Sequence, residues 1–302
     1  MEDFFYQYGI TSVVRAWGED AEDYLQSQWT IDITKIKKNE VRFGLRLTSK
    51  GKILAGAYIA RLDDEEFLLI GEKISATEII QMMEENVVAD EIEFSDDSGR
   101  WEFLSLYFSD PTACSSKLNK SAPQDNQFLD FEGGWLWIDK RMQNGFYLAL
   151  VKKDAEPKIS PIEGLAHISK EKFECLRIQN GNFSIPAEIG QEDLPQEAVM
   201  EKYAVDFNKG CYLGQEVMAR LHAMGQVQKH VLAVRWEGKS APPPPLPANI
   251  MMDQKSVGTL RSLIKDGNTC TGVAKIHLKA KERFLENGLD LEDPEMGKVF
   301  SL

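Results

Sequence analysis

The 302-residue chain has few cysteines, no long apolar run and no excess of positive charge. Its four cysteines lie far apart and form no C-x-x-C pair, which argues against a disulfide framework and against a closed zinc site. No apolar stretch approaches the roughly 20 residues that a membrane-spanning helix needs. The formal net charge of −13 disfavours a broad, non-specific nucleic-acid binder, because such proteins neutralise phosphates with Lys and Arg.

The N-terminal stretch MEDFFYQYGI is acidic and lacks the basic and then apolar pattern of a signal peptide. Hydrophobic residues make up 43 % of the chain and charged residues 27 %, the balance of an ordinary globular protein. We therefore expect a cytoplasmic protein with reduced thiols. We expect neither a membrane partner nor a stably bound metal.

Hydrophobic periodicity predicts an α+β fold with mostly antiparallel strand pairs. In the first part of the chain, a helix follows Asp20, strands cover 41–47, 52–62 and 66–71, and an amphipathic helix covers 74–88. In the second part, the pattern predicts a strand over 100–109, a hairpin of 133–142 with 145–153 around Asn144-Gly145, and a helix over 169–181.

Four consecutive prolines at 242–245 mark the clearest boundary, because such a stiff, extended run enters neither a helix nor a central strand. Short strands are predicted around it at 230–238, 255–264 and 270–278. We therefore expect a small β-barrel or sandwich over 227–302. The preceding region, 1–226, is expected to consist of two halves, approximately 1–96 and 97–226, which can be interleaved.

The segment KGCYLGQEVMAR, residues 209–220, holds the most unusual combination of residues in the chain. Gly210 and Gly214 bracket Cys-Tyr-Leu and permit positive φ or a close approach of backbones. GQEVMARL predicts a helix start, with Glu216 in the first turn and Arg220 four residues on, where the two can pair. Cys211 then precedes a helix N-terminus and follows a lysine, two features that favour the thiolate.

Two interpretations of Cys211 stay open on spacing alone. A lone cysteine between glycines is also typical of a small buried residue. A nucleophilic cysteine normally needs a nearby histidine as base. His222 follows eleven residues later, and it lies away from the thiol if the predicted helix continues through it.

The octapeptide KGCYLGQE, residues 209–216, matches every specified position of K-G-C-Y-x-G-Q-E, the hallmark of the YgfZ family of folate-binding proteins related to the glycine-cleavage T-protein. DAEDYLQSQWTIDIT, SKGKILAGAYIAR and LRIQNGNFSIPAEIG resemble further segments of that family. The chain also resembles the family's mitochondrial branch, which assists iron–sulfur cluster assembly. The motif residues are Lys209, Gly210, Cys211, Tyr212, Gly214, Gln215 and Glu216, with Arg220 in the continuation.

The resemblance implies two intertwined α+β halves around a central, folate-sized opening, followed by a small β-barrel. It implies that tetrahydrofolate or a related folate is the cofactor and that iron–sulfur assembly proteins or client enzymes are the partners. tRNA is then reached only indirectly, through enzymes that modify it. In this reading Cys211 is a functional thiol.

Two departures from the T-protein bear on activity. The T-protein's aminomethyl transfer uses a carboxylate in a hairpin that corresponds here to KGKILA, where Leu54 and Ala55 occupy the acidic positions. We therefore expect no such aminomethyltransferase activity. The T-protein also has a glutamate that binds the aminopyrimidine edge of the pterin. Gln179 stands at that place here, and it makes no charge-assisted bond because it is neutral.

Three further residues are candidate folate contacts. Gln28 and Asp32 match polar positions of the family's first motif and are expected to face the opening, and Trp29 is a candidate for stacking on a ligand ring. Helix capping, solvent exposure and ordinary core packing are the alternative roles for these three residues and for Gln179. Three functions stay open: a folate-dependent accessory protein for iron–sulfur clusters, a tetrahydrofolate-dependent aminomethyl or methyl transferase, and a non-catalytic scaffold.

Overall fold

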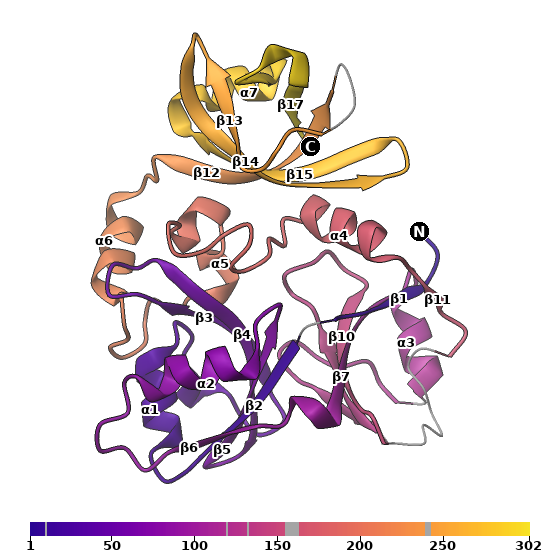
Figure 1. Cartoon of the computed structure of the whole chain (residues 1–302). Coiled ribbons are helices and arrows are strands. Elements are labelled where there is room, and N and C mark those ends of the chain that lie inside the picture. The colour runs from indigo at the N-terminus through magenta and orange to yellow at the C-terminus, as the bar shows by residue number, and fades with distance from the viewer. Residues whose placement is uncertain (10, 119, 132, 155–162, 239–242) are drawn as a thin grey trace.

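The computed structural model describes residues 1–9, 11–118, 120–131, 133–154, 163–238 and 243–302. These residues form two sheets and a closed six-stranded barrel, and the barrel sits at one end of the molecule above the sheets (Figure 1). The α+β fold with a C-terminal β-barrel is confirmed. No helix in the described ranges combines the length and the apolar character that crossing a bilayer requires.

A five-stranded sheet forms the first part of the chain. Its order is β3 (Val41–Leu47), β4 (Ile53–Asp63), β5 (Glu66–Glu72), β2 (Thr11–Trp17) and β6 (Glu93–Asp96). Helices α1 (Ala21–Gln28) and α2 (Ala76–Glu84) pack with it, and a 3-10 turn covers Ile33–Lys35. The three strands predicted at 41–71 are confirmed within one or two residues.

Helix α2 is shorter than the predicted 74–88. The Ser75 side chain caps its first turn by accepting from the backbone N–H of Glu78, whose carboxylate accepts from the backbone N–H of Ser75. After Glu84 the backbone makes tighter bonds, from Asn86 N–H to the Met83 carbonyl and from Val87 N–H to the Glu84 carbonyl. These bonds to the third preceding residue end the helix.

A six-stranded sheet forms the second part. Its order is β11 (Ala166–His167), β1 (Phe4–Gln7), β7 (Trp101–Tyr107), β10 (Phe146–Lys152), β9 (Gly134–Ile138) and β8 (Leu129–Phe131), with α3 (Pro111–Leu118) beside it. Strand β1 pairs with β7, so the start of the chain belongs to this second sheet. A short 3-10 turn, Ser98–Arg100, leads into β7.

The predicted hairpin is confirmed, because β9 pairs antiparallel with β10 and the Phe146 N–H donates to the Gln143 carbonyl across Asn144-Gly145. The first strand is shorter than the predicted 133–142. Strand β9 ends at Ile138 and β10 begins at Phe146, which leaves a seven-residue connection, 139–145. The Asp139 N–H still donates to the Phe146 carbonyl at 3.1 Å, and the Asp139 carboxylate accepts from the Tyr58 hydroxyl and from Arg141. The connection thereby carries charged residues toward the centre of the molecule.

Helix α4 (Lys170–Gln179) lies between the sheets and the barrel (Figure 1). It begins where the Ser169 hydroxyl accepts from the Lys172 N–H, as the predicted helix over 169–181 requires. A 3-10 turn (Pro195–Ala198), α5 (Glu201–Ala204) and α6 (Gln215–Met224) follow it before the barrel.

The barrel closes in the order β12 (Lys229–Glu237), β15 (Thr269–His277), β14 (Lys255–Asp266), β13 (Ala248–Met252), β16 (Leu289–Leu291) and β17 (Lys298–Ser301). Helix α7 (Lys281–Asn287) and the 3-10 turns Leu278–Ala280 and Pro294–Met296 complete it. The first prolyl residue of the predicted boundary, at 242, falls outside the described residues. The division at 226/227 stays a proposal.

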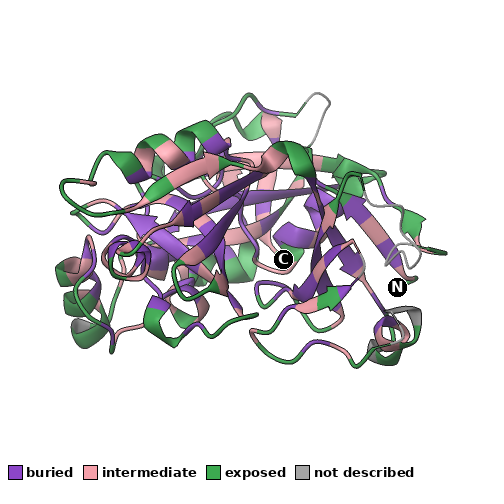
Figure 2. Cartoon of the chain, turned by 90° about the horizontal axis from the view of Figure 1, so that it is seen from below, coloured by how far each residue is buried: buried purple, intermediate pink, exposed green. Residues whose placement is uncertain are grey.

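Core clusters lie between the two sheets and inside the barrel. In Figure 2 the buried residues gather on the central strands, and exposed residues are frequent on the outer helices and loops. One core cluster joins the two sheets, through residues such as Tyr58, Phe103 and Trp137. Another joins β3 and β4 to the chain around α4–α6 and to the barrel, through Leu45, Ile178 and Val273. This packing places the centre of the molecule between three structural units, where a site can draw residues from all of them.

Candidate functional site

A small cavity lies at the centre, between the five-stranded sheet, the 139–145 connection and the segment after α4. Its volume is about 20 Å³, room for roughly one water molecule. Gly56 lines this cavity, and a side chain at that position would clash with the Phe43 ring, since a Cβ would lie 2.6 Å from it. The charged lining residues are Glu72, Lys73, Arg141 and Arg177. Side chains therefore fill the folate-sized opening that the resemblance implies.

Arg141 is the main cation of one wall. It donates from Nη2 to Glu72 Oε1 at 2.6 Å and from Nη1 to Glu72 Oε2 at 3.1 Å. Its Nε donates to Asp139 Oδ1 at 3.2 Å, the oxygen that also accepts the Tyr58 hydroxyl at 2.6 Å. The guanidinium lies 4.8 Å from the centre of the Phe43 ring and 4.7 Å from that of Tyr58. Burial by itself lowers the pKa of Arg141, but the negative charges of Asp139 and Glu72 raise it well above its ordinary value.

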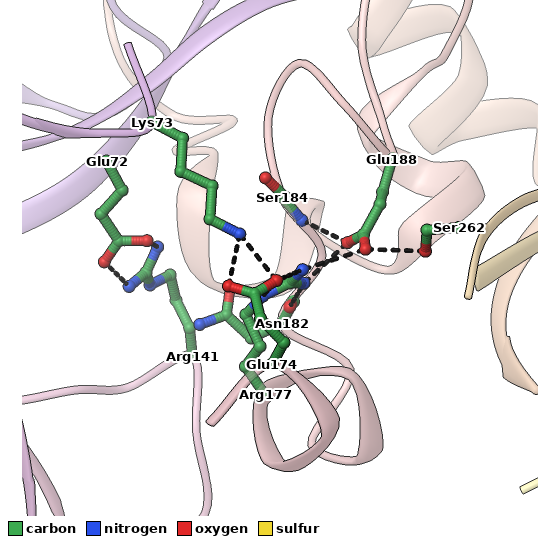
Figure 3. Close-up of polar contacts among 9 residues, drawn as sticks. All are labelled: Glu72, Lys73, Arg141, Glu174, Arg177, Asn182, Ser184, Glu188 and Ser262. Atoms are coloured by element: carbon green, nitrogen blue, oxygen red, sulfur yellow. Dashed lines mark hydrogen bonds and ion pairs between the residues drawn. The ribbon is translucent and has the colours of Figure 1, made fainter. Parts of the chain in front are cut away.

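A second buried ion network joins α4 to the barrel beside this cavity (Figure 3). Arg177 donates to Glu188 at 2.6 and 3.0 Å and from its Nε to Glu174 at 2.9 Å. Lys73 reaches both oxygens of Glu174, at 2.7 and 2.8 Å. The hydroxyl of Ser262, on barrel strand β14, donates to Glu188 at 2.8 Å. Burial raises the pKa of Glu174, but hydrogen bonds and charge from Arg177 and then from Lys73 outweigh it, so the pKa falls below its ordinary value.

An outer cavity of about 240 Å³ lies next to the first, because Phe43, Tyr58 and Arg141 line both. Trp137 and Tyr203 add aromatic surface to it. Its cationic lining residues are Arg42, Lys140, Arg141 and Lys202. No described lining residue of this cavity is acidic. The outer cavity is thus aromatic and positive in a chain whose net charge is −13.

Two buried polar atoms in these walls have no hydrogen-bond partner in the described structure. They are Oγ of Ser184, in the small cavity, and Nε1 of Trp137, in the outer one. The two residues are 7 % and 2 % exposed. A buried polar group without a partner costs about 1–3 kcal/mol, so a ligand that bonds to these atoms is favoured. Taken together, the walls suit a ligand with a polar, aromatic ring system and an anionic end.

The KGCYLGQE segment forms the loop that leads into α6, and Lys209 anchors it. The residue is 8 % exposed, and its ammonium donates to the carbonyls of Gln26, Trp29 and Ile31 at 2.6, 2.6 and 2.8 Å. These carbonyls lie in and just after the last turn of α1, where a helix presents its negative end. Burial lowers the pKa of Lys209 to about 8. Lys209 therefore attaches the motif loop to the N-terminal motif.

Cys211 itself is exposed. Its neighbour Tyr212 is buried, with its ring centre 5.1 Å from the Lys209 ammonium. Gly214 has a φ of +85°, and a Cβ there would lie 2.5 Å from the Thr48 carbonyl oxygen, so only glycine fits. Tyr212 and Gly214 thus fix the backbone after the cysteine, whereas Cys211 itself is exposed to solvent.

The rest of the motif forms the start of α6. Gln215 begins the helix, and its side-chain amide donates to the Lys209 carbonyl at 3.5 Å. Glu216 and Arg220 are both exposed, and the ion pair expected between them is not formed among the described residues. His222 lies farther along α6 and stacks on Phe207, with ring centres 3.9 Å apart. Gly210 has open space around it, so no close contact there requires glycine.

Replacing Lys209 with Met is expected to lower the free energy of unfolding by about 2–4 kcal/mol, because three buried carbonyls lose their donor. Urea denaturation at pH 7 measures this. The exposed Lys37, changed to Met, is the matched control and is expected to shift stability by less than about 0.5 kcal/mol. Equal effects of the two changes would contradict the anchoring role of Lys209.

The difference in stability between the wild type and Lys209→Met is also expected to depend on pH. The pKa of Lys209 is about 8 in the folded chain against an ordinary value of 10.5. Between these values the unfolded chain binds more protons, so its unfolding free energy rises with pH. The wild type is therefore expected to gain stability relative to Lys209→Met as the pH rises from 8 to 10.5.

The structure places the N-terminal candidates beside the motif loop and away from the central cavities. The Trp29 side chain is 0 % exposed and packs in the core between α1 and the five-stranded sheet, so it offers no free ring face to a ligand. Gln28 is buried next to Ser27, to whose hydroxyl it donates at 2.8 Å. Neither residue lines the central or the outer cavity as described. Their roles as folate contacts stay predictions.

Asp32 belongs to a charged cluster near Lys209. It accepts from Gln26, Thr34 and Lys35. Burial raises its pKa, but these hydrogen bonds outweigh burial and lower the pKa to about 2. The backbone N–H of Asp32 donates to Asp206, which also pairs with Arg42 of the outer cavity. Asp32 does not line either cavity as described, and its role as a folate contact also stays a prediction.

Gln179 ends α4 with an exposed side chain, outside the described lining of both cavities. Leu54 is half-buried and Ala55 is buried in β4, and neither carries a carboxylate. Sequence reasoning missed Glu72, Arg141 and Ser184 of the small cavity, and Glu188 of the ion network beside it. Glu174 and Arg177 are three residues apart on α4, a spacing that predicts an ion pair. This spacing was the sequence signal for the network that contains Glu188.

A family described as the GCVT N-terminal domain matches residues 11–121. The tRNA-modifying protein YgfZ of Hamiltonella defensa is 26% identical over 231 residues, covering 72% of this chain and 65% of that protein. The mitochondrial iron–sulfur cluster assembly factor IBA57 homolog of Cryptococcus neoformans is 23% identical over 244 residues, covering 74% and 64%. These matches confirm the resemblance to the YgfZ family.

The fold of the chain is similar to that of a glycine-cleavage T-protein. The glycine cleavage system aminomethyltransferase T from Bartonella henselae has a TM-score of 0.80 against this structure, at 12% identity, with coverage of 100% of this chain and 85% of that one. At that identity the likeness shows the fold alone. The matched region spans just under two thirds of the length of the two curated relatives, so their activities and partners are not carried over as findings.

Proposed function

We propose that this chain is a folate-binding accessory protein that supports iron–sulfur enzymes, with Cys211 as its functional thiol. The names of its relatives, a tRNA-modifying YgfZ protein and an iron–sulfur cluster assembly factor, support the client class. The observation that carries the proposal is the exposed Cys211 on a loop anchored by Lys209. tRNA enters only through enzymes that modify it.

The lining residues of the small and outer cavities suit the chemical groups of a folate, but the volume of the small cavity is too small for its ring. A pteridine ring would bond to Ser184 Oγ and lie against Arg141, and the aminobenzoyl ring would lie against Trp137 and Tyr203. The glutamate carboxylates would then meet the cations of the outer cavity, such as Lys140. A ring does not fit in 20 Å³, so binding requires the side chains between the two cavities to move. Tetrahydrofolate, when bound, supplies a reduced carrier of one-carbon groups.

A tetrahydrofolate-dependent transferase is the second candidate, and the cavities argue against it. Leu54 and Ala55 provide no carboxylate. Glu72 is the acidic residue in the described lining of the small cavity, and Arg141 holds both of its oxygens. Both carboxylate oxygens are thereby engaged in a bidentate pair with a guanidinium and are not free to contact a ligand. Folate-dependent aminomethyl or methyl transfer by the purified chain would overturn this reasoning.

Folate binding is tested by titrating tetrahydrofolate against intrinsic tryptophan fluorescence, which Trp137 in the outer cavity is placed to report. Changing Ser184 to Ala is expected to weaken binding by roughly threefold to tenfold, because one hydrogen bond to the ligand is lost. Ser105 is the matched control, since its hydroxyl is also buried without a partner but lies outside both cavities as described. No fluorescence change with wild type, or equal weakening by Ser105→Ala, would refute this placement. The non-catalytic scaffold would then gain support.

Iron–sulfur clusters are proposed to be cargo of this chain. Within the described residues, no group of three or more His, Cys, Asp or Glu is arranged to hold a metal ion. Clusters usually take four cysteine ligands, and the motif supplies one. A cluster handled at Cys211 would therefore take further thiols from a second chain or from a small thiol. Visible absorbance after anaerobic reconstitution, present in the wild type and absent in Cys211→Ser, is the expected result.

A further inference from the structure

The ion pair between Arg42 and Asp206 connects the outer cavity to the chain that leads into the motif loop. Arg42 lines that cavity, and its Nη2 lies 2.9 Å from Asp206 Oδ2 and 3.2 Å from Oδ1. Among the described residues, Nε and Nη1 of Arg42 donate no hydrogen bond. A guanidinium presents its donors as a planar fork, so Arg42 can hold Asp206 and an anion in the cavity at the same time.

Asp206 belongs to a segment that is tied to the chain after α1. Its N–H donates to the Thr30 carbonyl at 2.9 Å, and its carboxylate accepts from the Asp32 N–H at 2.7 Å. Two residues earlier, the Ala204 carbonyl accepts from the Thr30 hydroxyl. The Asp206 carboxylate therefore has two partners, the cavity cation on one side and the backbone after α1 on the other.

The motif loop follows this segment directly. Lys209 and Cys211 come three and five residues after Asp206. Lys209 donates to the backbone carbonyls on either side of Thr30, so Asp206 and Lys209 grip the same stretch of chain. Burial lowers the pKa of Lys209 to about 8, and the negative charges of Asp32 and Asp206 oppose that effect. The position of the Asp206 carboxylate thus bears on the charge of Lys209 and on the backbone that leads to Cys211.

We propose that Asp206 is a positioning residue that couples occupancy of the outer cavity to the order of the motif loop. The inference rests on the proposed folate function, because a folate carboxylate is the anion expected at Arg42. With the cavity occupied, the ligand and Asp206 hold Arg42 from two sides. Asp206 is then held more firmly as well, and so is the loop that presents Cys211. Bound folate thereby orders the thiol loop.

The outer cavity offers a matched control for this coupling. Lys140, another of its cations, pairs with Asp125 at 3.1 Å, and the Asp125 side chain is 77 % exposed. Asp125 has no hydrogen bond or ion pair to the motif loop in the described parts of the chain. Asp125→Asn and Asp206→Asn each remove an aspartate from a cation of the cavity. Only Asp206→Asn also removes a link to the loop.

The experiment measures hydrogen exchange of the backbone amides of residues 205–214 in the full chain, with and without saturating tetrahydrofolate. Folate is expected to slow exchange in the wild type by about fivefold, a typical size for coupling between two sites. Asp125→Asn is expected to keep this slowing. Asp206→Asn is expected to lose it while it still binds folate, so any general stabilisation by the ligand is common to all three proteins.

Arg42→Gln is the second variant, and it also loses the slowing at saturating folate, because Gln cannot bridge two carboxylates. Tryptophan fluorescence measures folate binding by each protein, and circular dichroism checks its fold. If tetrahydrofolate does not bind to the wild type, the proposed folate function fails and the coupling falls with it. If it binds and exchange over 205–214 is unchanged, the coupling alone is wrong. The same conclusion follows if Asp206→Asn keeps the slowing, or if Asp125→Asn loses as much of it as Asp206→Asn.

Discussion

Arg177→Met is expected to lower the free energy of unfolding by about 3–5 kcal/mol at pH 7, the largest stability change among these variants. The guanidinium lies between Glu174 and Glu188, whose side chains are 5 % and 3 % exposed. Met has no charge, so Glu188 loses its only cationic partner among the described residues and Glu174 keeps Lys73 alone. Urea denaturation, followed by fluorescence and circular dichroism, measures the change.

The pH dependence gives this prediction a second readout. The pKa of Glu174 is lowered in the wild type, so its stabilising contribution is present above the ordinary value of 4.5 and is lost as pH falls through the folded value. In the variant, Glu188 is a buried carboxylate without a cation, and its protonation at low pH relieves the penalty. The difference between the two proteins is therefore expected to narrow from pH 7 to pH 4.

Arg235→Met is the matched control for this change. Arg235 pairs with Glu237 on the barrel surface, and the two side chains are 47 % and 50 % exposed. Its loss is expected to cost less than about 1 kcal/mol, as exposed pairs do. Adding Glu174→Gln and Glu188→Gln to Arg177→Met is expected to restore part of the stability, because no buried charge is then left unpaired. A loss below about 1 kcal/mol for Arg177→Met, or a gap that widens in acid, would contradict the role given to this network.

Cys211→Ser is expected to abolish support of an iron–sulfur enzyme in cells that depend on this chain, and to leave the fold intact. The thiol is exposed, so the change to a hydroxyl is expected to shift stability by less than about 0.5 kcal/mol. The readout is the activity of a cluster-dependent tRNA-thiolating enzyme in cells that carry either version. Folate affinity of the purified variant is expected to equal that of the wild type, which separates loss of the thiol from loss of the ligand site.

Thiol labelling tests the same point on the purified protein. Cys114, Cys175 and Cys270 are buried, so Cys211 is expected to be alkylated first under native conditions. Cys270→Ala, which removes a buried thiol, is the control that is expected to keep activity in cells. Full activity of Cys211→Ser would refute a thiol role while leaving folate binding untouched.

The strands, the helix starts and the need for Gly214 were accessible from the sequence because they depend on neighbours in the chain. Alternation of apolar residues over 41–71 predicts strands wherever one face is buried, and Ser169 caps a helix with a residue three positions away. The Asn144-Gly145 turn was accessible for the same reason, and the Phe146 N–H donates to the Gln143 carbonyl across it. The early end of β9, at Ile138, was not accessible. Just after β9, the Asp139 carboxylate accepts from Tyr58, which lies 81 residues away, and local patterns carry no information on such a contact.

The motif loop shows the same division between near and distant contacts. The octapeptide KGCYLGQE singles out Cys211 as the candidate functional residue, and the exposure of Cys211 is compatible with the proposed thiol role. The sequence does not predict that the Lys209 ammonium donates to carbonyls at the end of α1, because those carbonyls lie about 180 residues earlier in the chain. A single lysine gives no signal of which distant backbone atoms it contacts. Trp29 was read as a candidate for ring stacking, and only the three-dimensional packing shows that its ring is enclosed.

The residue patterns predict the α+β class and a C-terminal β-rich unit, and the resemblance to the YgfZ family makes that unit a barrel. The lack of a carboxylate at Leu54 and Ala55 is also read directly from the sequence. Only the tertiary structure shows which charged residues pair in the interior. Glu72 meets Arg141 across 69 residues and Lys73 meets Glu174 across 101. Local propensity and spacing carry no information on such pairs, because only the folded chain brings them into one buried site, where low dielectric makes them matter.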